Sequence, residues 1–343
     1  MVQEFSNLKC QRILIENYRM TEATFHIVCR FNARLVHILL GLGCLLCGPA
    51  MAAERQEVTL HVRSEVGHVR AIHRKPAEPN GHSPVLFLHS YEAPCADAFD
   101  LPGYSWLDEL SREGFDAWAI DLHGFGKYGS LASMQSSAKL STAVADVSQV
   151  IDDLKQRSST QRVTLVGWGW GGVLAAMASI EDPASVDRLV LLGVMDGKNT
   201  AVPLDAWKRT VDGAPEMVGA EALMSEWTRM LSGIEEDATP DAFEQFRHLI
   251  QRCSPSNPIG PVKDMVDIWS TQLPFEPHQI SVPTLLLRGD HDDYVTGGLA
   301  SQISGSHELV LHHATHWVPY EKGRTFLYLH VSNFLAHKNL VKP

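Results

Sequence analysis

The chain has 343 residues, of which 45% are hydrophobic and 20% charged, so it is long enough to bury one large core. Its net charge at pH 7 is −11 and it carries no long basic run, which argues against nucleic acid as a partner. The acidity is typical of a soluble surface.

The pattern of the N-terminal segment is typical of a leader peptide and not of a part of the folded domain. From Leu35 the chain reads LVHILLGLGCLLCGPAMAAERQ, an apolar run that ends in Ala50-Met51-Ala52. This pattern is typical of a secretory signal cleaved before Ala53, and the run is short for a membrane span of about 20 residues. We therefore expect residues 1–52 to be removed and the mature protein to be exported, periplasmic or secreted, without a stable membrane anchor. An N-terminal membrane anchor is the alternative.

The mature chain then alternates strand-like and helix-like segments. Several of the strand-like runs are almost continuously apolar, as expected for strands buried on both faces. Between two of them, STAVADVSQVIDDLKQ places its apolar residues at helical spacing. This alternation predicts an α/β fold with a doubly wound, mostly parallel sheet flanked by helices. The predicted strands cover residues 57–64, 68–74, 84–90, 116–124, 163–168, 188–194, 284–290 and 308–314.

The alternation breaks between Asp196 and Ser281. This segment contains amphipathic stretches such as AEALMSEWTRML and DAFEQFRHLI, with proline-rich joints and no clear strand. It predicts a helical cap at residues 197–281, inserted into a core made of residues 53–196 and 282–343. The Trp, Met and Leu residues of the cap favour a partly apolar small-molecule substrate or ligand.

Two cysteines remain in the mature chain once the leader is removed. Cys95 follows a strand at the carboxyl edge of the sheet, where a cap would lie, and Cys253 is in the predicted cap. We expect that the two can approach and form a disulfide in an oxidising compartment. Two exported cysteines need not pair, so a free pair is the alternative.

The stretch VTLVGWGWGGVLAA carries the most specific signal. An apolar strand stops at Gly167, and a helix of small residues begins after Trp168, Gly169 and Trp170. The frame G-x-?-x-G at such a strand-to-helix turn normally holds a nucleophilic serine at its centre. Here the central residue is Gly169, which has no side chain.

Other polar residues follow other strands. Ligands of open α/β sheets bind beyond the carboxyl ends of the strands. The strand ends are followed by His89-Ser90, by HGFG, by Asp196, by DHDDYV and by ATHW. With these motifs in this order, the mature chain resembles the α/β-hydrolase superfamily over nearly its whole length. It is similar to bacterial members that carry FDLPGYSW, GFDAWAIDLHGFG and a G-W-S-W-G-G turn.

The resemblance implies a catalytic site of the nucleophile–acid–histidine kind. The acid falls on Asp292 in RGDHDDYV and the histidine on His316 in ATHW, with Asp196 as the alternative acid. Each of these also has a structural interpretation: Asp292 as a turn carboxylate and His316 as one of three neighbouring histidines.

The same resemblance places an oxyanion hole near the turn. Its donors would be the backbone N–H of Trp170 and one from the loop that contains Ser90 and Tyr91, where Ser90 replaces the family's usual glycine. His89 and Asp121 are expected to be structural. The histidines and aspartates lack metal-ligand spacing, so we expect no metal site and no cofactor.

Gly169 leaves three hypotheses open. The chain is a hydrolase of ester, lactone or amide bonds by descent, with the usual serine activity absent or severely reduced. Or it is a non-catalytic binding or sensing protein on the same scaffold. Or His316 and Asp292 activate a water without a covalent intermediate. On the first hypothesis, we expect a serine placed at 169 to meet His316 and the Trp170 N–H without other changes.

Overall fold

The computed structural model describes residues 54–64, 66–126, 139–213, 217, 219–253 and 258–337. The predicted leader and its cleavage site lie outside the described residues. Within the described ranges, none of the helices has the length and apolar character needed to cross a membrane.

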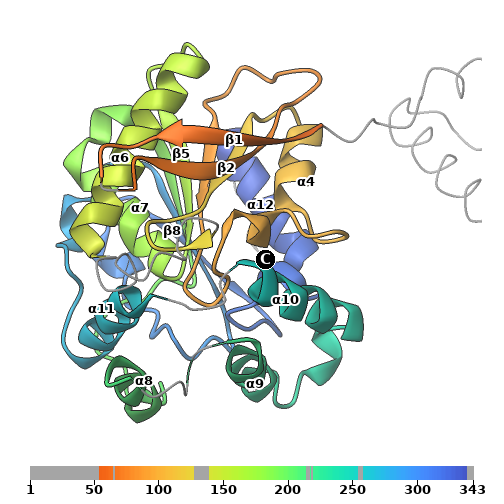
Figure 1. The fold of residues 1–343 in the computed structure, drawn as a ribbon, viewed down its shortest axis with the longest axis vertical. Helices are drawn as coiled ribbons and strands as arrows, with labels where there is room; N and C mark the ends of the chain where they lie inside the picture. The colour runs from red at the N-terminus through yellow and green to blue at the C-terminus, as the bar shows by residue number, and fades with distance from the viewer. Residues whose placement is uncertain are drawn as a thin grey trace, which may run out of the picture. The chain divides into compact units, whose positions relative to one another are not determined.

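One mixed sheet organises the described core (Figure 1). Its strand order is β1-β2-β4-β3-β5-β6-β7-β8. The first two strands form an antiparallel hairpin, β2 pairs antiparallel with β4, and all the other pairings are parallel. The predicted α/β fold is therefore confirmed. The strands are β1 (Arg55–His61), β2 (His68–Arg74), β3 (Val85–Leu88), β4 (Ala117–Ile120), β5 (Val163–Trp168), β6 (Val186–Leu192), β7 (Thr284–Gly289) and β8 (His307–Leu311).

The central strands explain where a site can form. Strands β3, β4 and β5 are buried at every position, as their continuous apolar runs predict. Strands β3 and β5 are paired in parallel with Leu88 opposite Gly167, so their carboxyl ends lie side by side. Ser90 and Gly169, two residues further along each chain segment, consequently leave the sheet at neighbouring points.

Helices cover both faces of the sheet (Figure 1). Helices α4 (Trp106–Arg112) and α12 (Arg324–Leu335) lie on one side, and α6 (Leu140–Arg157) and α7 (Trp170–Glu181) on the other. Ser105 caps α4, because its hydroxyl accepts a hydrogen bond from the Asp108 N–H. The short 3₁₀ helices that are described are η1 (Ala96–Phe99), η3 (Pro183–Ser185), η4 (Glu235–Asp237), η5 (Pro277–Gln279), η6 (Ala300–Gln302) and η7 (Val318–Tyr320).

In the described part of the chain between β6 and β7, four α-helices lie within the segment predicted as a cap. They are α8 (Leu204–Val211), α9 (Ala220–Met230), α10 (Pro240–Cys253) and α11 (Ile259–Ser270). They gather at one end of the core in Figure 1. Each buries an apolar stripe, and three tryptophans are almost completely buried: Trp207, Trp227 and Trp269.

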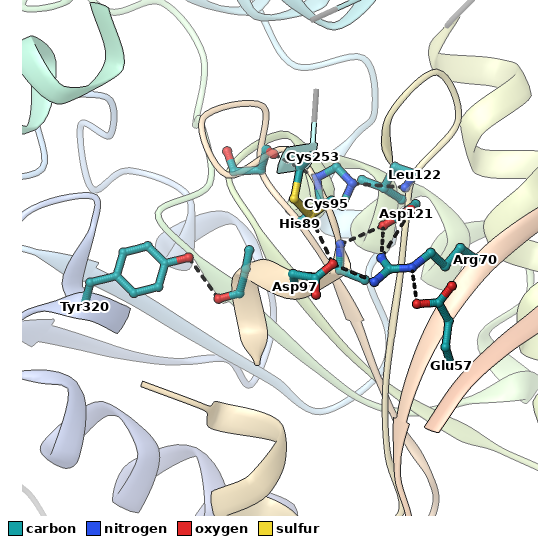
Figure 2. The surroundings of a disulfide bond; sticks show 12 residues. Glu57, Arg70, His89, Cys95, Asp97, Asp121, Leu122, Cys253 and Tyr320 are labelled. Carbon is teal, nitrogen blue, oxygen red and sulfur yellow. Dashed lines mark hydrogen bonds and ion pairs between the residues drawn. A yellow bond between two sulfur atoms is a disulfide. The ribbon is translucent and has the colours of Figure 1, made fainter. Parts of the chain in front are cut away.

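A disulfide joins the cap to the loop after β3. Cys95 lies directly before η1 and Cys253 is the last residue of α10, and Figure 2 shows the bond between them. Their Cα atoms are 5.6 Å apart, inside the range that a disulfide requires. The bond fixes the end of α10 to the same short loop that contains Ser90.

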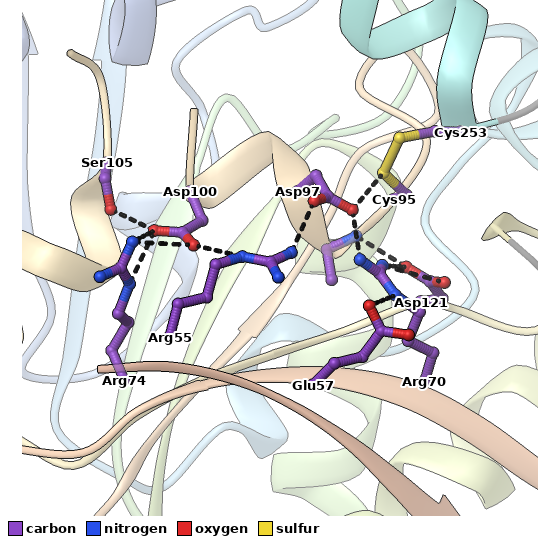
Figure 3. A network of polar contacts seen from close by, with 11 residues as sticks. Arg55, Glu57, Arg70, Arg74, Cys95, Asp97, Asp100, Ser105, Asp121 and Cys253 are labelled. Atoms are coloured by element: carbon purple, nitrogen blue, oxygen red, sulfur yellow. Dashed lines mark hydrogen bonds and ion pairs between the residues drawn. A yellow bond between two sulfur atoms is a disulfide. The ribbon is translucent and has the colours of Figure 1, made fainter. Parts of the chain in front are cut away.

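Ion pairs hold the short helix η1, which directly follows this loop (Figure 3). Arg55 of β1 contacts Asp97 at 2.9 Å and Asp100 at 3.0 Å. From β2, Arg70 contacts Asp97 at 2.7 Å and Arg74 contacts Asp100 at 3.1 Å. A partly buried network of this kind holds its geometry better than an isolated surface pair. The β1–β2 hairpin therefore positions η1.

Candidate active site

The turn between β5 and α7 is sharp and tightly packed. Gly169 occupies it with φ 52° and ψ −120°, a conformation that costs a residue with a side chain about 1–3 kcal/mol. The start of α7 packs against the end of β3, because a Cβ at Gly171 would collide with the Leu88 and His89 carbonyl groups. Glycine at 169 avoids this conformational cost, and glycine at 171 is required by the close approach of the β3 backbone.

The predicted acid and histidine meet beside this turn. His316 lies in the loop after β8 and Asp292 in the loop after β7, and Nδ1 of His316 is 3.0 Å from Oδ2 of Asp292. The other carboxylate oxygen of Asp292 accepts a hydrogen bond from the Tyr294 N–H at 3.1 Å. The indole of Trp168 donates to the His316 carbonyl at 3.1 Å. These contacts hold the imidazole with Nε2 directed toward Gly169.

A second buried carboxylate, which the sequence did not indicate, faces the other nitrogen of His316. Oε2 of Glu92 is 3.7 Å from Nε2 of His316, and Glu92 is 1% exposed. The same oxygen accepts a hydrogen bond from the hydroxyl of Ser90. Glu92, His316 and Asp292 therefore form an acid–histidine–acid trio, with Ser90 attached to one end of it.

The trio favours a charged histidine. Burial alone lowers the pKa of His316, but Asp292 and Glu92 outweigh burial and raise it to about 10. Burial raises the pKa of Glu92, but the hydrogen bonds from His316 and Ser90 outweigh it, so the pKa is lowered overall. With its pKa raised in this way, His316 is an imidazolium at neutral pH and can donate a proton from Nε2.

Another buried acid positions the loop that carries the histidine. Glu321 is 0% exposed and accepts hydrogen bonds from the Thr315 N–H at 2.9 Å, from the Thr315 hydroxyl and from the indole of Trp227 at 2.8 Å. Burial raises the pKa of Glu321 above its usual value. No motif in the sequence pointed to this residue, because its partners come from the cap and from its own loop.

The remaining sequence candidates have structural partners. Asp196 accepts hydrogen bonds from the Thr296 N–H and hydroxyl and from the Gly298 N–H, which closes the loop after β7. Asp292, not Asp196, is hydrogen-bonded to His316. His89 connects strand ends, since its Nε2 accepts the Leu122 N–H at 3.0 Å (Figure 2). Burial lowers the pKa of His89 to about 4.

The oxyanion candidates are divided between two elements. Trp170 is the first residue of α7, and its N–H belongs to the first helical turn, whose N–H groups have no intrahelical partner. Tyr91 lies in the loop that follows β3, next to Ser90. The Trp170 indole donates to Asp264 of α11 at 3.1 Å, so the start of α7 is also tied to the cap.

One expectation from the sequence is wrong. An ideal Cβ at residue 169 would overlap the Ser90 hydroxyl and would lie 2.9 Å from Ser90 Cβ. Real Cβ atoms do not come within 3.0 Å of such neighbours. A serine at 169 therefore cannot be accommodated without other changes, because Ser90 must first give way.

Aromatic side chains from the cap helices and from neighbouring loops pack against one another beside the trio. Ring centroids are 5.0 Å apart for His316 and Tyr294, 6.2 Å for Tyr294 and Trp207, and 5.8 Å for Trp207 and Tyr91. Trp269 of α11 lies 5.6 Å from Trp207. All of these rings are at most 2% exposed. Within the described residues, His316 is therefore almost completely shielded from solvent.

The sheet, the inserted helices and the acid–histidine pair at the strand ends define a hydrolase-type α/β protein. A family model described as serine aminopeptidase, S33 (Hydrolase_4) matches residues 105–309, which is more than half of the chain. The chain belongs to this family of the α/β-hydrolase superfamily, and the resemblance seen in the sequence is confirmed.

Individual relatives are distant. Epoxide hydrolase 4 of Mus musculus is 24% identical over 243 residues, covering 65% of this chain and 63% of the mouse protein. The enol-lactonase from Burkholderia xenovorans LB400 has a TM-score of 0.62 at 17% identity, covering 81% of this chain and all of its own. The esterase from Exiguobacterium antarcticum has a TM-score of 0.63 at 16% identity, covering 82% of this chain and all of its own. At these identities the solved structures establish the fold alone.

Proposed function

We propose that the protein is an exported hydrolase of small, partly apolar molecules with an ester, lactone or amide bond. Its reaction does not use residue 169 as the nucleophile, because glycine has no side chain. The usual activity of a serine at this turn is accordingly absent.

One observation carries this proposal. The pair formed by His316 and Asp292 is complete, and Nε2 of His316 lies 3.3 Å from the position that a Cβ of residue 169 would take. A buried, hydrogen-bonded pair is held in place by Trp168, Tyr294 and Glu321, and a protein that had no use for it would have no physical reason to keep it. The family of the chain supports a hydrolytic reaction.

The aromatic side chains beside the trio support the partly apolar substrate. Tyr91, Trp207, Trp269 and Tyr294 offer ring faces and edges on the cap side of His316, which suits an aromatic or alkyl group better than a charged one. Among the relatives, enol-lactonase, esterase and epoxide hydrolase names all denote small-molecule hydrolysis. The mammalian relative makes epoxides a bond class to include in any substrate screen.

Export is supported by the leader pattern and by the paired cysteines. A disulfide persists in an oxidising compartment and is rare in the cytosol, so Cys95 and Cys253 fit the secretory signal before Ala53.

Hydrolysis by the purified, oxidised protein tests the function. The protein is assayed against acyl esters, lactones, anilides and epoxides of increasing apolar size, with His316→Ala as the background. We expect turnover of at least one ester, lactone or amide substrate, lost in His316→Ala. Absence of turnover on the whole panel, or turnover that survives His316→Ala, contradicts the proposal.

A second candidate is a ligand-binding protein without catalysis. It is favoured by the charge state of the trio, since a His316 with a pKa of about 10 is not a base at neutral pH. The same observation weighs against water activation by His316 and Asp292 alone. Saturable binding of apolar esters or lactones without turnover, measured by calorimetry, would support this candidate.

A further inference from the structure

The two departures from the family pattern meet at one point in space. Ser90 stands at the end of β3 and Gly169 at the end of β5, and these strands are paired in parallel. The hydroxyl of Ser90 overlaps the position of the missing Cβ of residue 169. The space that Gly169 leaves is thus filled by the hydroxyl of Ser90.

From this geometry we infer that Ser90 is the nucleophile of the hydrolase proposed above, reaching the reaction centre from β3 instead of from the turn after β5. The inference rests on the proposed function. Ser90 is therefore a catalytic residue rather than only a neighbour of the oxyanion hole.

The contacts of Ser90 support this role. Its hydroxyl donates to Oε2 of Glu92, and that oxygen is 3.7 Å from Nε2 of His316. Both residues are completely or almost completely buried, so the hydrogen bond is not shared with bulk solvent. A buried hydroxyl bound to an ionised carboxylate has a proton acceptor already in place. The lowered pKa of Glu92 keeps that acceptor ionised and also makes it a weaker base than an ordinary glutamate.

The arrangement also supplies the other groups that acyl transfer needs. The Ser90 oxygen would form a bond to the carbonyl carbon while its proton passes to Glu92. The carbonyl π electrons would move to the oxygen, close to the N–H of Trp170 at the start of α7. The carbon–leaving group bond would then break, and the leaving oxygen or nitrogen would take a proton from Nε2 of the charged His316.

Water completes the cycle with the same groups. After His316 has given its proton to the leaving group, the proton on Glu92 would pass to Nε2 of His316, which is the stronger base, so Glu92 is again a carboxylate and can accept a proton from water. The hydroxide adds to the acyl carbon, and the bond to the Ser90 oxygen breaks. Ser90 recovers its proton from Glu92, and the acid product leaves. The starting charges of Glu92 and His316 are restored, and no other reactant is required.

A charged histidine is then an advantage. In a triad with serine at the turn, histidine must begin as a base. Here Glu92 takes the serine proton, and His316 begins as an acid whose charge Asp292 stabilises. The roles of base and acid are divided between two side chains that touch each other.

A serine-directed fluorophosphonate tests the inference directly. The oxidised protein is treated with the probe, digested, and the adduct is mapped by mass spectrometry. We expect the adduct on Ser90. The mapping uses the unaltered protein, so it is decisive even if a variant fails to fold.

Three variants extend the test to turnover. Ser90→Ala should lose the adduct and more than about 100-fold of kcat. Glu92→Gln retains an acceptor oxygen but loses the charge, so kcat should fall about 100-fold or more with a smaller change in KM. Ser179→Ala is the matched control: Ser179 is a buried serine of α7 that donates to the Ala176 carbonyl, and its removal should leave both readouts unchanged.

The outcomes separate the two proposals. Turnover that depends on His316 but survives Ser90→Ala, or an adduct mapped to another residue, overturns the role of Ser90 and leaves the hydrolase function standing. If turnover is lost in Glu92→Gln but not in Ser90→Ala, the carboxylate of Glu92 and not the hydroxyl of Ser90 carries the reaction, and the role of Ser90 is also overturned. Absence of both turnover and adduct overturns both proposals.

Discussion

Replacing Gly169 by serine should destabilise the protein, and the damage should be partly reversed by removing the side chain of Ser90. Two separate costs act on the single variant. A side chain at φ 52° and ψ −120° costs about 1–3 kcal/mol, and forcing a Cβ into the space of the Ser90 hydroxyl costs about another 1–3 kcal/mol. The free energy of unfolding should therefore fall by about 2–6 kcal/mol.

The double variant Ser90→Gly/Gly169→Ser removes the overlap but keeps the backbone strain. A double-mutant cycle should therefore show a favourable coupling of about 1–3 kcal/mol between the two positions. The assay is chemical denaturation of the parent, both single variants and the double variant at one pH and with the disulfide intact. Ser90→Gly alone serves as the reference for the loss of the hydrogen bond to Glu92.

Two results would refute this reasoning. The first is a Gly169→Ser protein as stable as its parent, which would mean that Ser90 does not occupy the space. The second is a coupling of zero, which would mean that the two side chains do not compete. If the coupling is found, the double variant also places a hydroxyl at the turn beside His316, and the fluorophosphonate adduct should move to position 169.

Three further predictions concern charge, the disulfide and processing. The pKa of His316 is raised from 6.5 to about 10, so its contribution to the free energy of unfolding should be complete below about pH 6.5 and lost as the pH rises through about 10. Imidazole NMR signals should report the charge of His316 across this range, and unfolding midpoints should report its effect on stability. A neutral His316 at pH 7 would contradict the prediction. Cys95 and Cys253 are 158 residues apart, and reducing the bond between them should lower the free energy of unfolding by at most about 5 kcal/mol. The measurement is the difference in denaturation midpoint with and without reductant. Equal midpoints would show that the bond does not form. The exported protein should begin at Ala53, and an intact mass that includes the leader would rule this out.

The sheet could be predicted because its strands are nearly unbroken apolar runs. All eight predicted strands occur, and the differences are at their ends. The run predicted to end at Ser90, for example, ends as a strand at Leu88, and the next residue, His89, uses its side chain to accept a hydrogen bond from the Leu122 N–H after β4. Helices α9 and α10 were predictable from the amphipathic spacing of AEALMSEWTRML and DAFEQFRHLI, and the first of these stretches buries Trp227.

The site was only half predictable. Asp292 and His316 lie in short frames after strands, and such frames can be recognised from the order of residues alone. Glu92 and Glu321 do not lie in any sequence motif that marks them as functional. Their importance comes from burial among partners distant in sequence, such as His316 for Glu92 and Trp227 for Glu321. The competition between Ser90 and residue 169 depends on strand pairing, which the sequence does not reveal residue by residue.

The ion pairs of the β1–β2 hairpin give the position of leader cleavage a structural meaning. Arg55 is separated from the predicted cleavage point by only Ala53 and Glu54. A peptidase that cut a few bonds further along would remove Arg55. Asp97 and Asp100, in and directly after the helix η1 that follows the loop with Ser90, would then have fewer cationic partners. N-terminal trimming would therefore alter the support of the candidate site, and a shortened protein made for study should start no later than residue 54.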